Sequence, residues 1–257
     1  MQAFYRHLLS AMARGGEIST ANKAVMNLTG FFRRGIARNL WAEAANPFRC
    51  IEKQKALRRQ KVRLTKAEHQ AVVAVELPAG GPMWRARAAY LTQFYLRGER
   101  IGAVLLLRWA NLHQHGTQVR YQAQKNGPFK QVPVRPELAA LLAAFAPHRA
   151  AGGVFVLPYL PANYDKLNPE QQLAGIKRAT ALINKHLKRV ALLADVDKPL
   201  RSHAARHTFA TLAARAVGIG PLQSMLGHAT PKQTQLYVQD LDTDEVDAAA
   251  DAAFDSF

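Results

Sequence analysis

Hydrophobic residues recur at helical spacing over most of the chain. Between Val25 and Ile36 they return every three or four residues on one face, which predicts a helix over about residues 20–38, after a first helix over 2–13. Further helices are expected over residues 66–76, 84–95, 136–146, 169–193, 203–217 and 220–226.

Two short segments have the residues of β-strands instead. They span 119–122 and 131–134, and the sequence Lys-Asn-Gly-Pro at 125–128 between them is typical of a turn. The sequence therefore predicts a mainly α fold with a small antiparallel β-sheet, an α+β class.

Capping residues indicate where several helices begin and end. Thr65 and Glu68 form a capping box for the helix that starts at residue 66. Gly227 suits the left-handed conformation that ends a helix, and Thr230 followed by Pro231 predicts a new short helix. His228 is therefore expected in the gap between two helices.

The composition indicates a globular chain with a basic surface. Of its 257 residues, 49% are hydrophobic, the formal net charge is +17, and Cys50 is the single cysteine. Seven of the 18 acidic residues lie in 240–257 without a base, so residues 1–239 hold 35 basic residues against 11 acidic ones. Such a surface favours nucleic acid as the partner over a membrane, and one cysteine excludes an internal disulfide.

A basic stretch divides the chain into domains. We expect a helical domain over 1–48, a linker over 49–63, a second domain over 64–240 and an acidic tail helix over 241–257. A solvated hinge would explain the linker, but phosphate contact explains its charge better. The predicted DNA-binding residues are Arg49, Lys53, Lys55, Arg58, Arg59, Lys61 and Arg63.

Residues 202–238 contain three histidines, two arginines and a tyrosine, but no acid. His203 and His207 have the spacing of a helical metal pair, but Ala204 stands where a metalloprotease motif needs glutamate, and Arg206 would repel a cation. His207 is more simply explained as a structural histidine bonded to the backbone. Taken singly, the histidine at 228 and Tyr237 would be a loop residue and a packing residue.

Taken together, these motifs resemble the tyrosine recombinase, or phage integrase, family. His203 and Arg206 match its H-x-x-R motif, 226–228 its L-G-H motif, and Tyr237 its nucleophile nine residues later. The sequence G-E-R-I over 98–101 is similar to the family's first motif, and Lys125 to its hairpin lysine. The resemblance covers about residues 20–240.

The resemblance implies a metal- and ATP-independent enzyme that cleaves and rejoins DNA through a 3′-phosphotyrosine intermediate. Two arginines would clamp the phosphate, His203 would take the phenolic proton, Lys125 would protonate the 5′ oxygen, and His228 would donate to a non-bridging oxygen. The implied catalytic residues are Tyr237, Arg100, Arg206, His203, His228 and Lys125.

The chain departs from the family pattern in three places. Ala103 stands where relatives carry an acid, so the charge partner of Arg100 is expected elsewhere, with Glu99 as a candidate. Ala204 and Ala205 replace an Asp-Leu pair. The segment before the linker is about half the expected core-binding domain, which predicts an abbreviated or truncated domain.

Three functions remain open at this point. The leading one is a recombinase from a prophage or other mobile element, cytoplasmic and nucleoid-associated, acting on double-stranded DNA. It would be a tetramer on paired sites and a monomer or dimer without DNA, with a possible DNA-bending accessory protein. The others are a DNA-binding regulator that keeps the fold without recombining, and a topoisomerase-like enzyme that relaxes DNA.

Overall fold

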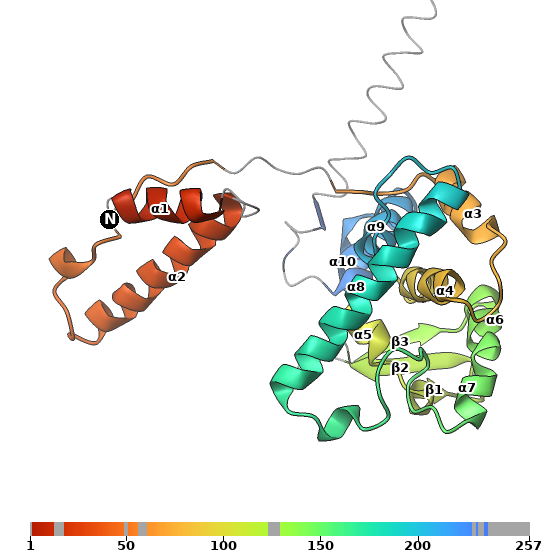
Figure 1. Ribbon diagram of the computed structural model, residues 1–257. Coiled ribbons are helices and arrows are strands. Elements are labelled where there is room, and N and C mark those ends of the chain that lie inside the picture. The colour runs from red at the N-terminus through yellow and green to blue at the C-terminus, as the bar shows by residue number, and fades with distance from the viewer. Residues whose placement is uncertain are drawn as a thin grey trace, which may run out of the picture. The chain divides into compact units, whose positions relative to one another are not determined.

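The computed structural model describes residues 2–12, 18–48, 51–55, 61–122, 129–227, 230 and 234–235. The chain forms two compact units, residues 1–60 and 61–257 (Figure 1). The domain boundaries inside the predicted linker and at the acidic tail stay predictions. Within the described residues, no helix is both long and apolar enough to span a membrane.

The first unit contains two helices, α1 (Gln2–Met12) and α2 (Ile18–Ala37), and a 3-10 turn, η1 (Glu43–Ala45). Both helices were predicted and are confirmed. Tyr5 of α1 is buried against Val25 of α2, and its hydroxyl donates to Asn22 Oδ1 over 2.5 Å. The same hydroxyl accepts from the backbone N–H of Gln54 over 2.9 Å, which ties the start of the basic stretch to this helix pair.

The second unit is mainly helical, as the sequence predicts. Its helix α4 packs against α8, α9, α6 and α5 and forms the centre of the unit. Its helices are α3 (Lys66–Ala74), α4 (Pro82–Tyr95), α5 (Ile101–Leu105), α6 (Pro136–Ala144), α7 (Ala146–Ala150), α8 (Pro169–Leu193), α9 (Ser202–Val217) and α10 (Ile219–Leu226), with 3-10 turns η2 (Trp109–Asn111) and η3 (Tyr164–Lys166).

The sheet has three antiparallel strands in the order β1 (Leu112–His113), β2 (Gln118–Gln122) and β3 (Phe129–Pro133). The sequence predicted two strands. It missed β1, because two residues are too short to show an alternating pattern, and it placed β3 two residues too late. Tyr121 of β2 lies opposite Lys130 of β3 in the register.

Two of the predicted caps are present, at Thr65 and at Gly227. Thr65 and Glu68 form the reciprocal capping box at the start of α3, and Asn168 forms another at the start of α8. Gly227 ends α10 with φ 63°, in the left-handed region. Thr234 and Gln235 are helical, in the region where a short helix was predicted.

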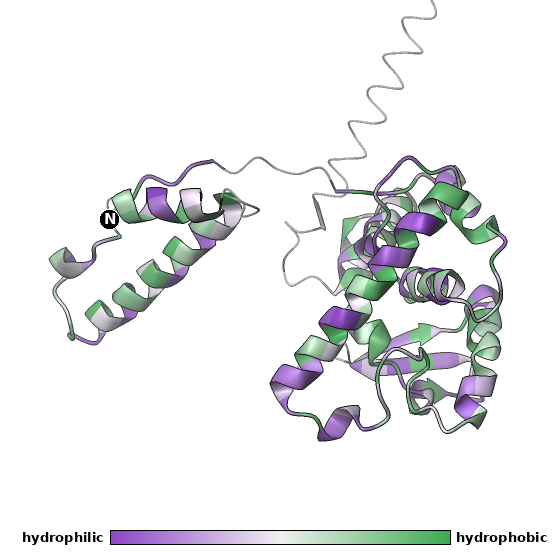
Figure 2. Ribbon diagram, in the orientation of Figure 1, coloured by the Kyte–Doolittle hydropathy of each residue, from purple (hydrophilic) through white to green (hydrophobic). Residues whose placement is uncertain are grey.

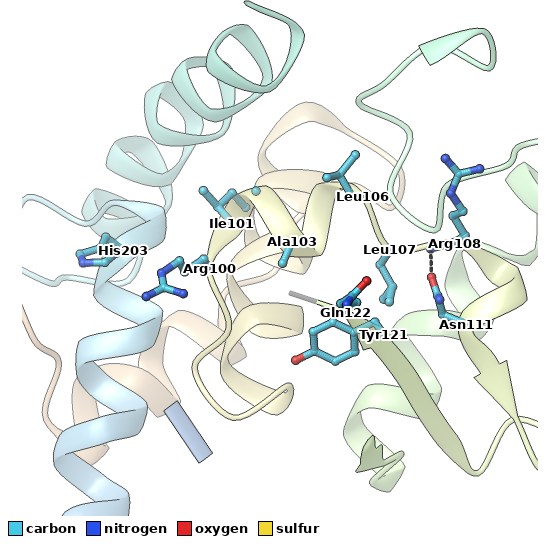
Figure 3. A pocket seen from close by; sticks show the side chains of 11 residues that line it. Arg100, Ile101, Ala103, Leu106, Leu107, Arg108, Asn111, Tyr121, Gln122 and His203 are labelled. Atoms are coloured by element: carbon cyan, nitrogen blue, oxygen red, sulfur yellow. Dashed lines mark hydrogen bonds between the residues drawn. The ribbon is translucent and has the colours of Figure 1, made fainter. Parts of the chain in front are cut away.

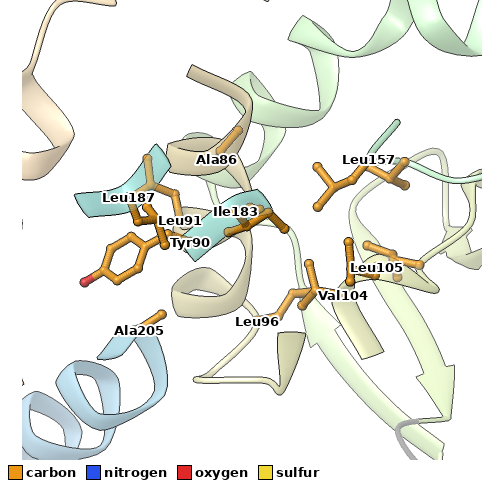
Figure 4. Packing of buried hydrophobic residues seen from close by; sticks show 14 of the residues in the cluster. Ala86, Tyr90, Leu91, Leu96, Val104, Leu105, Leu157, Ile183, Leu187 and Ala205 are labelled. Carbon is orange, nitrogen blue, oxygen red and sulfur yellow. The ribbon is translucent and has the colours of Figure 1, made fainter. Parts of the chain in front are cut away.

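The core of the second unit joins α4, α8 and α9. Tyr90, Ile183 and Leu187 are fully buried and lie together with Ala205 (Figure 4). Hydrophilic and hydrophobic bands alternate along α8, as expected for a helix with one buried face (Figure 2). The backbone N–H of Leu64 donates to Thr208 Oγ1 over 2.9 Å, which fastens the beginning of this unit to α9.

Candidate active site

Arg100 follows a turn with an unusual backbone. Arg97 and Gly98 have φ angles of 59° and 70°, both left-handed, and Arg100 is the exposed N-cap residue of α5. A Cβ atom on Gly98 would lie 3.1 Å from Phe209 Cδ1 and 3.3 Å from Arg206 Cα. Glycine at 98 therefore allows both the backbone angle and the close approach of α9.

Arg206 joins this turn to the end of α10. It is only 2% exposed, and its two terminal nitrogens donate to backbone carbonyls: Nη1 to Gly98 over 2.8 Å and Nη2 to Leu226 over 2.7 Å. Charged donors to buried carbonyls make strong hydrogen bonds. Arg206 therefore holds together two segments that carry predicted site residues.

His203 lies one turn before Arg206 on α9 and is exposed. The surrounding protein still removes solvent from its ring, and this lowers its pKa, with further lowering by the charges of Arg206, Lys61 and Arg100. Its ring meets that of His207 edge to face, with centroids 4.4 Å apart. Burial lowers the pKa of His207 to about 3. His203 is therefore neutral at neutral pH and able to accept a proton.

A cavity of about 560 Å³ opens beside these residues. Arg100 and His203 lie at one end of it, and Arg108 and Asn111 lie at the other (Figure 3). The described residues that line it include two arginines and one histidine but no acid. Ala103, which stands where relatives carry an acid, also lines the cavity. Arg108 forms an ion pair with Asp165 over 2.6 Å, so Arg100, at the other end of the cavity, is the arginine of this lining that offers its charge to a bound anion.

Glu99 does not hold Arg100 in the way expected from the sequence. Its carboxylate accepts the backbone N–H of Arg100 at Oε1 over 2.8 Å, and its ion-pair partner is Lys130, whose Nζ lies 2.6 Å from Oε2. The reason is that the side chain of Glu99 is fully buried, whereas Arg100 is exposed. The carboxylate fixes the main chain of Arg100 and does not neutralise its guanidinium.

Lys130 was missed in the sequence, although a signal for it existed. Residues two apart on a strand face the same side, so Lys130 shares the face of Val132, which is buried. A lysine on the core side of a strand needs a buried acid as its partner. The sequence did not reveal which acid, because Glu99 lies 31 residues away.

Three of the six predicted catalytic residues, Arg100, His203 and Arg206, are described, and the structure brings them together. Lys125, His228 and Tyr237 lie outside the described residues. The nearest described residues are Gln122 and Phe129 for Lys125, Gly227 for His228 and Gln235 for Tyr237. The catalytic roles stay predictions.

The predicted DNA-binding residues of the basic stretch fall in both units. Lys53 and Lys55 are exposed in the first unit, and Lys61 and Arg63 are half-buried in the second. Arg49, Arg58 and Arg59 lie outside the described residues. Contact of this stretch with DNA stays a prediction.

The phage integrase family model matches residues 63–244, which includes all six predicted catalytic positions. The chain belongs to this family. This integrase-family chain is 32% identical over 212 residues to the tyrosine recombinase XerC of Mesorhizobium japonicum, covering 80% of the chain and 62% of that relative. It is 26% identical over 228 residues to the tyrosine recombinase XerD of Ralstonia nicotianae, covering 85% of the chain and 68% of the relative. The chain thus spans less than two thirds of the first of these relatives.

Solved structures share the fold of this integrase-family chain. XerH recombinase bound to palindromic difH substrate in a post-cleavage complex aligns with a TM-score of 0.67 at 17% identity, covering 97% of the chain and 71% of XerH. A lambda integrase tetramer bound to a Holliday junction aligns with a TM-score of 0.63 at 13% identity, covering 92% and 64%. The predicted fold class, helical with a small antiparallel sheet, is confirmed.

Proposed function

We propose that this integrase-family chain is a site-specific DNA recombinase that cleaves and rejoins DNA through Tyr237. The observation that carries the proposal is the convergence of Arg100, His203 and Arg206 at one site. These residues come from two motifs about a hundred positions apart, and the cavity beside them has no acid in its described lining. A site of this kind favours a phosphate diester as substrate.

The chemistry assigned to the site exchanges one phosphoester bond for another in each step. The phenolic oxygen of Tyr237 attacks the phosphorus while His203 takes its proton, and the bond to the 5′ oxygen breaks. Lys125 gives a proton to that oxygen, so the products are a 3′-phosphotyrosine and a 5′ hydroxyl. The reverse steps rejoin a strand, and no ATP is consumed.

The two arginines have different parts in this scheme. Arg100 is exposed beside the cavity and donates to the non-bridging oxygens, with His228 as a second donor. Arg206 adds a buried positive charge that stays in place whether or not DNA is bound, because two carbonyls hold its guanidinium. Fixed charge of this kind needs no reorganisation during the reaction.

Double-stranded DNA is the proposed partner. The excess of basic residues in 1–239 supports it, and so do the DNA-bound states of the structural neighbours. By likeness to the lambda integrase tetramer, we propose assembly as a tetramer on paired sites. Action in the bacterial cytoplasm on nucleoid or phage DNA, with an accessory bending protein, belongs to the same proposal, as does an origin in a prophage or other mobile element.

Covalent capture tests the function without a known target. The protein is incubated with fragmented DNA from its source, the mixture is denatured in detergent, and DNA that remains attached to protein is sequenced. We expect the attached ends to converge on one short sequence. A nicked duplex of that sequence should then accumulate the adduct, because the small fragment beyond the nick diffuses away.

Each alternative function gives a different result. No attached DNA, with intact binding, would reject the recombinase and favour a DNA-binding regulator. Attached ends at unrelated sequences, together with relaxation of supercoiled plasmids that lack the captured sequence, would favour a topoisomerase-like enzyme.

A further inference from the structure

The ion pair between Glu99 and Lys130 lies where three parts of the site meet. The side chain of Glu99 is fully buried and that of Lys130 is 17% exposed. Among the buried polar residues of the described chain, Glu99 is the only acid. A buried carboxylate destabilises the fold unless it is paired and hydrogen-bonded, so the partners of Glu99 matter for the structure around it.

The carboxylate is fully engaged. Oε2 accepts from Lys130 Nζ over 2.6 Å and from the Tyr121 hydroxyl over 2.9 Å, while Oε1 accepts the backbone N–H of Arg100 over 2.8 Å. The backbone carbonyl of Glu99 accepts from Gln93 Nε2 over 2.8 Å. The strands β2 and β3 and the helix α4 thus all hold the residue that precedes Arg100.

Lys130 also reaches α10. Its Nζ lies 3.4 Å from the carbonyl of Met225, and a Cβ on Gly227 would lie 3.2 Å from its Cε. Leu226, between these two residues, accepts the hydrogen bond of Arg206. Lys130 therefore contacts the end of α10 beside the segment that Arg206 holds.

We propose that Glu99, Tyr121 and Lys130 form a positioning unit that fixes Arg100 relative to Arg206 and to the β2–β3 hairpin. The proposal rests on the proposed function, since it concerns the same site. In this scheme the three residues take no part in the making and breaking of bonds. They set the place of Arg100, whose backbone N–H is bonded to the Glu99 carboxylate.

The charges around Glu99 give the unit a measurable signature. Burial alone would raise the pKa of its carboxyl. The hydrogen bonds from Lys130, the Arg100 N–H and Tyr121 lower the pKa by more than burial raises it, so the net pKa lies below the ordinary value. Burial and the charge of Glu99 raise the pKa of Tyr121, which Arg97 and Arg206 partly oppose. Without Lys130, the burial contribution would dominate, and the pKa of Glu99 would rise.

The test compares Lys130→Met, Glu99→Gln and the double variant in single-turnover cleavage of a nicked duplex. We expect Lys130→Met to lose about 10- to 100-fold in rate, as for a small misplacement of catalytic groups, with DNA affinity within about twofold of wild type. The loss should deepen as the pH falls, because the carboxyl protonates at a higher pH. The double variant should cleave faster than Lys130→Met and lack this acid limb, since no charge is left unpaired.

Lys198→Met is the matched control. It removes an ion pair of similar length, 2.7 Å to Glu68, whose residues belong to the second compact unit but do not line the cavity. It should leave cleavage and its pH dependence unchanged. If Lys130→Met is folded and also cleaves like wild type at every pH, the positioning unit is rejected.

A second readout does not depend on cleavage. The backbone amide of Arg100 is bonded to the Glu99 carboxylate, so its NMR shift follows the ionisation of that group. We expect its titration midpoint to rise in Lys130→Met and the titration to vanish in Glu99→Gln. An unchanged midpoint in Lys130→Met would overturn the proposal. If wild type forms no adduct at all while the midpoint shifts as expected, the proposed function fails and the coupling between Lys130 and the Arg100 segment stands.

Discussion

The guanidinium of Arg206 donates to the carbonyl of Gly98 over 2.8 Å, although 108 residues separate them. This bond places the two arginine motifs of the chain beside each other. Because Gly98 is two positions before Arg100, the backbone that carries one arginine is held by the side chain of the other.

Gly98→Ala should destabilise the protein by more than the backbone strain alone. Gly80 has nearly the same φ, 71° against 70°, but a Cβ there would meet nothing within 4 Å. We expect Gly80→Ala to cost about 1 kcal/mol from strain, and Gly98→Ala about 2 to 3 kcal/mol, because it also pushes on Phe209 and Arg206. Denaturant unfolding measures both. Equal losses for the two variants would show that the close approach of α9 is not tight.

Arg100→Ala should reduce cleavage by about 10² to 10³ while DNA binding stays nearly intact, which is the scale for loss of one donor to a developing charge. Arg178→Ala removes the same charge from an exposed position on α8 and serves as the control. Single-turnover rates and binding curves at one salt concentration provide the comparison. A rate for Arg100→Ala within about threefold of the control would exclude Arg100 from the clamp, far below the expected loss.

Acid should destabilise the second unit partly through His69. Burial lowers the pKa of His69 to about 4; its ring is stacked on Phe94 with centroids 4.1 Å apart, and Nδ1 lies 3.3 Å from the Tyr90 hydroxyl. The unfolded chain binds a proton near pH 6.5 and the folded chain does not, so this contribution to stability is complete above 6.5 and is lost as the pH falls towards 4.

The expected size of this effect is about 1.4 kcal/mol per pH unit in that window. His69→Gln should remove it and flatten the dependence of unfolding free energy on pH, whatever its effect at neutral pH. His113→Gln, at an exposed position of β1, is the control. Parallel curves for wild type and His69→Gln would mean that His69 is protonated in the folded state as easily as in the unfolded one.

Lys125→Ala should be rescued by a substrate whose 5′ bridging oxygen is replaced by sulfur. A thiolate leaves without a proton, so the variant no longer needs the acid. Cleavage of the sulfur substrate should approach the wild-type rate, whereas Arg100→Ala should stay slow on it. Equal defects of Lys125→Ala on both substrates would assign the acid to another residue.

The sequence predicts those parts of the fold that depend on local chemistry. The reciprocal bonds of Thr65 and Glu68 and the left-handed end at Gly227 need only neighbouring residues, and both are present. The two-residue strand β1 and the five-residue helix α7 were missed, because segments this short are too short to show a periodic pattern.

The same division holds at the site. Arg100, His203 and Arg206 could be selected from their motifs and do lie together. The ion-pair partner of Glu99 could not be predicted from the sequence, because the choice of Lys130 over Arg100 depends on which side chain the fold buries. Tertiary contacts of this kind are absent from local patterns.

The covalent bond between Tyr237 and DNA is the step on which the proposed chemistry depends. Trypsin cleaves after Lys232, and the final peptide, residues 233–257, contains Tyr237 as its single tyrosine. Mass spectrometry of trapped, nuclease-trimmed adduct should find a 3′-linked nucleotide on Tyr237 of this peptide, and Tyr237→Phe should bind DNA but form no adduct. A nucleotide on any other residue, or an adduct that survives in Tyr237→Phe, would contradict the assignment of the nucleophile.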